Sequence, residues 1–203
     1  MHTRTSILFL LSLGLCAQEN PGGNRMGLSL AATTATGGFS DTFGSGFQFG
    51  LQIHFNRESR HLGRLRVDYM QMDNRKPIPY GTVASWNGSG WDTATTYASS
   101  RMEGYSVVYE WMPHLEAHSH SGFFGILGMG GTVWNESIHQ ADPSLWGGHD
   151  TDLGFTASAG LGWRFNPHAS VEARYVHTDL AFEGNHRYSS NRNYAAFGAT
   201  YRF

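Results

Sequence analysis

Hydrophobic and polar residues alternate one by one along much of the chain. Between Gly46 and Phe55 every second residue is large and apolar, and the residues between them are polar or glycine. The same pattern runs from Leu153 to Phe165, where apolar side chains alternate with Gly, Thr, Ser and one Arg. Because successive side chains of a strand point to opposite faces, this period of two predicts β-strands with one apolar face. Helical spacing is not sustained anywhere.

Further segments of the same kind bring the prediction to eight strands, the number of the smallest membrane barrels. The predicted strands are Met26–Thr34, Gly46–Phe55, Leu62–Met72, Met102–Met112, Phe123–Trp134, Leu153–Phe165, Ser170–Thr178 and Asn193–Phe203. Long connections follow the first, third, fifth and seventh strands, the longest running from Asp73 to Ser100, and shorter ones follow the others. This alternation predicts an all-β fold, an eight-stranded antiparallel up-and-down transmembrane β-barrel.

The direction of the apolar face separates a soluble barrel from a membrane barrel. An eight-stranded barrel has a narrow interior, which cannot hold Phe, Leu, Tyr and Trp from nearly every strand. These faces are therefore expected to point outward to lipid, with every backbone polar group paired by closure of the ring. A soluble sandwich is the alternative. Aromatic residues at strand ends on the short-turn side match an interfacial girdle: Trp111, Trp163, Phe165, Tyr201 and Phe203.

The first residues have the plan of a secretory signal. His2 and Arg4 precede an apolar run over 7–16, and Ala17 stands before polar residues, so we expect a signal peptide over 1–17 and a barrel domain over 18–203. The run is shorter than the roughly 20 residues of a membrane helix. Cys16 is the one cysteine of the sequence, so the mature chain is expected to hold no disulfide.

Composition narrows the class further. The sequence has 14 Lys and Arg against 16 Asp and Glu, a balance that argues against nucleic acid as a partner. It also has 26 glycines, 14% aromatic and 15% charged residues. That combination suits a membrane barrel, in which aromatic residues line the interfaces.

Charged residues on the polar faces are expected to point into the lumen. They are Arg64, Arg66, Asp68, Glu110, Arg164, Glu172, Arg174 and Arg202. Unpaired charge in a narrow lumen is costly, so we predict a salt-bridge network that closes it. Arg66 or Asp68 is expected to reach Glu110, and Glu172 to reach Arg202. An ion pathway through these charges is the alternative.

The last strand resembles the C-terminal signature of bacterial outer-membrane barrels, in which alternate residues are apolar and the last is Phe. Phe197, Tyr201 and Phe203 carry this resemblance, and the ending over 198–203 resembles the small eight-stranded OmpX/Ail type. The resemblance implies a bacterial outer-membrane location, contact with outer-membrane lipid and lipopolysaccharide, and an assembly signal read by the barrel-insertion machinery.

An enzyme is a further possibility, because the eight-stranded lipid A deacylases resemble this chain in size and plan. They carry His, one spacer and Ser late in the barrel. Here His177 is followed after one spacer by Asp179, and His186 precedes Ser189 by three residues, a separation that puts two strand residues on opposite faces. We therefore predict no enzymatic activity and no cofactor, with a lipid A-modifying barrel enzyme as the minority alternative.

Two histidine-containing segments hold residue types that can bind a metal ion. Their spacing fixes no coordination geometry, so no metal is predicted. The residues are His114, His118, His120, His149, Asp150 and Asp152.

Aromatic residues in the long loops are more suggestive of function. They lie among Gly, Ser, Thr and Asn, a composition typical of recognition surfaces: Tyr80, Trp86, Trp91, Tyr97 and Trp146. They could instead pack on each other or rest at the outer lipid interface. The sequence thus favours a non-enzymatic barrel that contributes to envelope integrity or to surface contact with an extracellular ligand through its loops. The alternative is a small channel or carrier for compact or apolar solutes.

Overall fold

The computed structural model describes residues 25–55, 61–114, 121–140, 148–180 and 191–203. The expected signal peptide lies outside the described residues. The elements are β1 (Arg25–Thr36), the 3-10 helix η1 (Gly37–Asp41), β2 (Phe43–Phe55), β3 (His61–Asn74), β4 (Ile78–Trp86), β5 (Trp91–Pro113), β6 (Gly122–Gln140), β7 (Gly148–Arg164), β8 (Ala169–Leu180) and β9 (Asn191–Arg202). No helix of the described ranges is long and apolar enough to cross a membrane.

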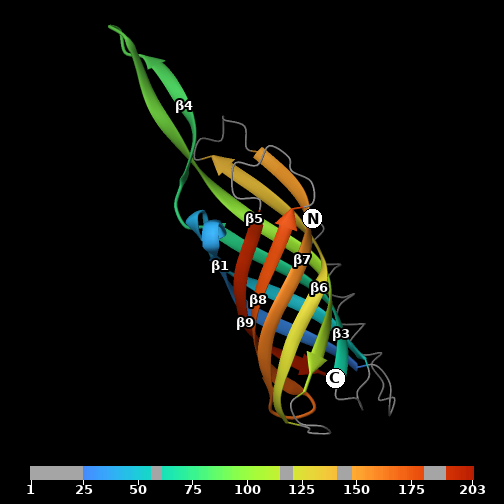
Figure 1. The fold of residues 1–203 in the computed structure, drawn as a ribbon. Coiled ribbons are helices and arrows are strands. Elements are labelled where there is room, and N and C mark those ends of the chain that lie inside the picture. The colour runs from blue at the N-terminus through green and yellow to red at the C-terminus, as the bar shows by residue number, and fades with distance from the viewer. Residues whose placement is uncertain (1–24, 56–60, 115–120, 141–147, 181–190) are drawn as a thin grey trace, which may run out of the picture.

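Eight of these strands close into a barrel (Figure 1). Each barrel strand pairs antiparallel with its neighbours in sequence, β1 pairs with β9, and β3 pairs directly with β5 over His61 to Asp73. Because the ring is complete, the barrel wall leaves no row of backbone groups without partners. The predicted eight-stranded up-and-down barrel is confirmed.

The connection from Asp73 to Ser100 is not the plain loop that was expected. It contains β4, which pairs with the outer part of β5, from Trp86 opposite Trp91 to Ile78 opposite Ala98. β5 has 23 residues, about twice the 9–11 that cross a bilayer. The β4–β5 hairpin, residues 78–98, therefore projects beyond the barrel (Figure 1).

The hairpin escaped the sequence prediction because its strands lack an apolar face. Side chains from Gly81 to Thr95 are exposed on both faces, apart from half-buried Gly90, so no burial imposes alternation. Thr, Val, Tyr and Trp, which favour strands, are nevertheless frequent here. Asn87 Oδ1 accepts hydrogen bonds from the backbone N–H of Ser89 at 3.0 Å and of Gly90 at 2.9 Å, which fixes the turn.

The other outer connections also differ from expectation. A long connection was predicted after the first strand, but only a short segment with η1 separates β1 from β2. β6 and β7 extend further outward than the segments predicted for them. The strands therefore continue past the membrane-spanning part of the barrel, and pairing between them satisfies their backbone groups there.

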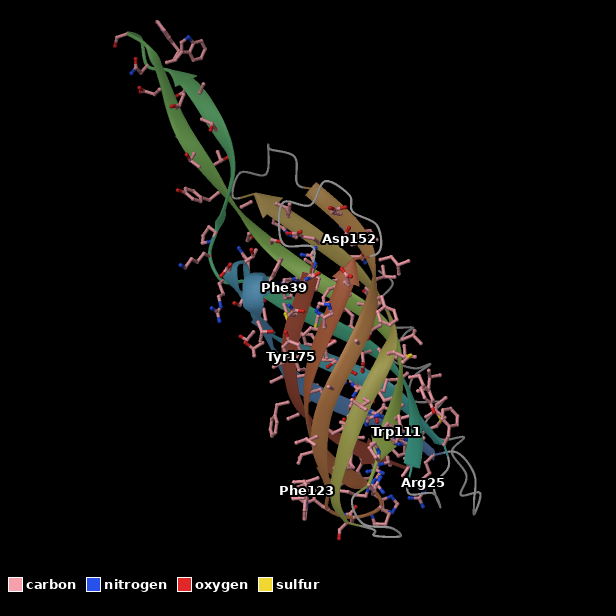
Figure 2. All side chains as sticks on the ribbon, viewed as in Figure 1. Arg25, Phe39, Trp111, Phe123, Asp152 and Tyr175 are labelled. Carbon is pink, nitrogen blue, oxygen red and sulfur yellow. The ribbon has the colours of Figure 1, made fainter. Side chains whose placement is uncertain are left out.

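The barrel is apolar outside and polar inside. Leu30, Met129, Leu161 and Phe197 are each more than 60% exposed on the outer face, as lipid contact requires. Near the end that carries the short turns, Trp111 and Phe123 lie on the outside (Figure 2). This arrangement confirms the predicted membrane barrel, and it excludes the soluble sandwich.

The interior is layered along the barrel axis. The inward side chains of β3 run in the order Leu62, Arg64, Arg66, Asp68, Met70 and Met72. Leu62 belongs to an apolar cluster with Met112, Phe124 and Ile126. Met70 and Met72 belong to a second cluster with Phe39, Phe43 and Trp134. The charged layer lies between them.

Candidate functional site

Glu110 is the centre of the charged layer and is fully buried. The β3–β5 register sets Arg64 directly opposite it, and Arg64 Nε donates to Glu110 Oε2 at 2.5 Å. Arg174 Nη1, from β8 on another part of the wall, donates to the other carboxylate oxygen at 3.3 Å. Glu110 thus links β5 to β8, two strands that do not pair with each other.

Arg64 also reaches across the lumen to Glu172 on β8. Its Nη1 and Nη2 donate to the two carboxylate oxygens at 2.6 and 2.9 Å, the parallel fork in which a guanidinium binds a carboxylate best. Gln52 Oε1 accepts a further bond from Arg64 at 3.1 Å, and Thr200 Oγ1 donates to Glu172 at 3.2 Å. These contacts fill the middle of the barrel from wall to wall.

Arg66 and Asp68 complete the layer. Arg66 Nη2 donates to Asp68 Oδ1 at 2.7 Å, and its Nη1 lies 3.6 Å from Glu172 and 3.8 Å from Glu110. Arg174 Nη2 donates to Gln48 at 3.1 Å. The central network therefore holds three arginines, Arg64, Arg66 and Arg174, and three carboxylates, Asp68, Glu110 and Glu172, so its formal charge balances.

All eight predicted lumen residues are buried, but their pairing differs in part from the expectation. Arg66 reaches Glu110 with its Nη1 at 3.8 Å, but Arg64, the register partner of Glu110, binds it more closely. Among the described residues no salt bridge joins Glu172 to Arg202, because Arg64 occupies both oxygens of Glu172. Arg164 and Arg202 lie apart from the central network, at the short-turn end, with the Arg164 guanidinium 5.8 Å from the Phe124 ring centroid.

Sequence reasoning missed the amides Gln48 and Gln52 as partners of the network, and a second ion pair. Arg192 Nη2 donates to Asp152 Oδ2 at 3.2 Å, near the outer end of the lumen. Both residues lie one position before the start of a predicted strand. Extending the alternation by one residue would have placed them inward.

The outer end of the lumen is occupied by rings. Phe39 of η1 is 3% exposed, and its ring centroid lies 4.9 Å from Phe43 and 6.1 Å from Trp134. Trp134 contacts Tyr194 at 6.2 Å, and the Arg192 guanidinium lies 5.5 Å from the Phe39 ring. Figure 2 shows Phe39 and Asp152 near this end of the barrel. We call this set the outer aromatic plug.

The hairpin carries four of the five predicted recognition residues. Trp86 and Trp91 face each other across its tip at 5.7 Å and stay 59% and 69% exposed, and Tyr97 is 53% exposed. The two indoles pack on each other and still present their faces to solvent. Tyr80 belongs to β4, and Trp146 lies outside the described residues.

Comparison with known proteins gives the family. The model of the outer membrane protein beta-barrel domain matches residues 5–203. The chain belongs to this family. An integral outer-membrane location follows, with the short turns of this outer-membrane barrel on the periplasmic side and the β4–β5 hairpin outside the cell. No curated protein matches the sequence.

Solved structures of small barrels are similar to this outer-membrane barrel in fold. Neisserial surface protein A is 17% identical with a TM-score of 0.52, and the match covers 91% of this chain and 100% of that one. OprG from Pseudomonas aeruginosa is 12% identical with a TM-score of 0.52, covering 90% and 96%. Ail of Yersinia pestis, in complex with the heparin analogue sucrose octasulfate, is 13% identical with a TM-score of 0.51, covering 89% and 97%. The barrel is of the small OmpX/Ail type.

The residues that resemble an assembly signal lie on the outside of the barrel, two in β9 and one directly after it. Phe197, Tyr201 and Phe203 are 64%, 54% and 40% exposed, and β9 closes the barrel against β1. Such a position leaves them accessible before closure. That the insertion machinery recognises these three residues stays a prediction.

The structure describes one of the two deacylase-like histidines, His177. His177 Nδ1 lies 2.6 Å from Asn193 Oδ1, and His186 and Ser189 fall outside the described residues. Within the described ranges no cluster of three metal-ligating side chains occurs, while His118 and His120 lie beyond those ranges.

Proposed function

We propose that this protein is a non-enzymatic outer-membrane barrel with a closed lumen, which acts through the β4–β5 hairpin in surface contact and contributes to envelope integrity. The observation behind this proposal is a contrast. Hydrogen-bonded and ion-paired side chains fill the lumen, whereas the hairpin extends beyond the barrel with the rings of Trp86, Trp91 and Tyr97 exposed. In this proposal the partners are outer-membrane lipid and lipopolysaccharide, the barrel-insertion machinery during assembly, and an extracellular ligand.

Three successive layers support a closed lumen. The outer aromatic plug and the balanced charge network are followed by a third layer, the periplasmic apolar cluster of Leu62, Met112, Phe124 and Ile126. The side chains named for the three layers are 8% exposed or less. A solute would have to break the network around Glu110, whose contacts cross the lumen. This is the reason to prefer the closed barrel over a channel or carrier.

The hairpin has the chemistry of a contact surface. An exposed pair of indoles at its tip offers large rigid faces, which are common anchors of recognition. From Ile78 to Ala98 the sequence holds a single charged residue, Asp92, among Thr, Ser, Tyr and Trp. The Ail structure holds a sulfated sugar analogue, but a hairpin without Lys or Arg favours an uncharged partner.

We propose on chemical grounds that the protein has no enzymatic activity. The deacylase pattern has a serine two residues after its histidine. In this chain Asp179 stands two residues after His177. A carboxylate in place of the hydroxyl cannot serve the same nucleophilic step.

Surface contact is tested with whole cells that display the protein. Replacing residues 78–98 by a short turn, or Trp86 and Trp91 by alanine, should reduce adhesion of cells to glycan-coated or protein-coated surfaces, with Thr82→Ala as the exposed control. Sensitivity to detergent, measured in the same strains, reports envelope integrity. Unchanged adhesion of the shortened variant, at equal surface levels, would refute the contact function. Unchanged detergent sensitivity on complete removal of the protein would refute the envelope function.

A further inference from the structure

Arg202 lies at the periplasmic end of the lumen, outside the central network. That network balances three arginines with three carboxylates, and Arg202 takes no part in it. Its side chain is buried, at 3% exposed. A buried guanidinium normally has a counter-ion, because its transfer out of water is expensive.

Arg202 lacks that counter-ion within the described part of the chain. Its Nε and Nη2 are buried and have no hydrogen-bond partner there. Arg164, Arg64 and Arg25 lie close enough to repel it, and Glu172 attracts it. Glu172, in turn, is bound through both oxygens by Arg64.

Neighbouring strands bring further polar groups to the same end. Ser170 Oγ on β8 is buried without a partner among the described residues, and Ser170 is the register partner of Thr200, two residues from Arg202. His54 Nδ1 on β2 is likewise without one. On β1, between β2 and β9, Gly27 is the register partner of Arg202, and a Cβ on Gly27 would stand 3.2 Å from Arg202 Cγ.

We propose that this periplasmic site binds an oxyanion of the phosphate class, held by the Nε and Nη2 of Arg202 and by the hydroxyl of Ser170. The guanidinium fork matches two oxygens of such an anion, and Arg164 and Arg64 add positive potential. The ligand chemistry is shared by two sources on the periplasmic side: free inorganic phosphate and the phosphate headgroup of an acidic lipid.

The site is tested on the full protein, refolded from urea in a neutral detergent. The midpoint of thermal unfolding, read from gel mobility, is measured while inorganic phosphate replaces chloride at constant ionic strength, in the low millimolar range. Wild type should gain several degrees in a saturable manner, since a ligand that binds only the folded state stabilises it by mass action. Ser170→Ala should weaken the apparent affinity about tenfold, as one lost charged hydrogen bond implies.

Arg202→Gln provides the decisive comparison. Without phosphate it should be at least as stable as wild type, because the substitution removes a repelled charge, and with phosphate it should gain nothing. Arg101→Gln, an exposed change outside this site, should respond like wild type. Nanodiscs distinguish the two sources. Free phosphate should stabilise wild type in nanodiscs of phosphatidylcholine. If added phosphatidic acid already saturates the site, so that free phosphate gives no further stabilisation, the lipid headgroup is the ligand.

Two results would overturn the proposal. One is a wild type without any saturable response to phosphate or to phosphatidic acid. The other is an Arg202→Gln variant that loses stability in phosphate-free buffer, which would mean that the chain itself supplies the counter-ion. If Arg202→Gln does not refold, the wild-type titration and the Ser170→Ala affinity decide between these outcomes.

Discussion

Replacing Glu110 by alanine should destabilise the barrel more than removing any exposed acid. The carboxylate is fully buried, with Arg64 Nε at 2.5 Å and Arg174 Nη1 at 3.3 Å. Arg66 Nη1 lies 3.8 Å away. Without Glu110, three guanidiniums remain beside two carboxylates in the middle of the lumen, where solvent does not reach them.

The expected cost follows from this uncompensated charge. Removing one partner of a buried ion pair typically costs about 3 to 5 kcal/mol. The matched control is Asp73, whose carboxylate binds Arg101 Nε at 3.1 Å in a pair that is 63% and 51% exposed. Such an exposed pair contributes about 1 kcal/mol or less, so Asp73→Ala should be nearly neutral.

The assay is reversible urea unfolding in detergent, followed by tryptophan fluorescence and gel mobility. Glu110→Gln should also destabilise the barrel, because it leaves the same excess of positive charge. Adding Arg174→Gln restores the balance, so the double variant should be more stable than the sum of the single effects predicts, by about 0.5 to 3 kcal/mol.

A small change in the free energy of unfolding would contradict this prediction. A Glu110→Ala barrel whose free energy of unfolding lies within 1 kcal/mol of wild type, as in Asp73→Ala, would refute the view that the network is dry and mutually dependent. Strict additivity in the double variant would refute the charge-balance argument in particular.

Three further predictions concern assembly and the outer end. The folded barrel should migrate differently on gels before and after boiling, because a closed barrel has no edge at which detergent can begin unfolding; identical mobility would count against closure. Deleting Phe203 should lower outer-membrane levels in cells far more than stability after refolding, whereas normal levels would remove the assembly role. Phe39→Ala should cost about 3 to 5 kcal/mol as a buried Phe, while Trp91→Ala should stay within about 0.5 kcal/mol; equal effects in urea unfolding would refute the outer aromatic plug.

The barrel could be predicted from sequence because lipid imposes a strict rule on each strand. An outward residue such as Phe197 must be apolar, and its neighbours face a polar interior, so alternation reports both faces. It also assigned the inward side to residues as far apart as Arg64 and Glu172. An alternation of period two can be seen in local sequence alone. The strands and their inward faces could therefore be predicted.

Contacts between side chains across the lumen could not be predicted from the alternation. Arg64 reaches Glu172 because it is long enough to span a narrow barrel from β3 to β8, and alternation carries no information on such distances. Phe39 was missed because it plugs the lumen from η1, outside any strand. The β4–β5 hairpin was missed because both its faces meet solvent, so that hydrogen bonding between strands, and not burial, defines it.

Conductance across a planar lipid bilayer tests the closed lumen most directly. Wild-type protein inserted from detergent should show almost no steady current, because the outer aromatic plug, the network around Glu110 and the periplasmic apolar cluster block the same path. Phe39→Ala combined with Glu110→Ala should introduce leak currents. Steady conductance of wild type at the nanosiemens scale would contradict the closed barrel and favour a channel instead.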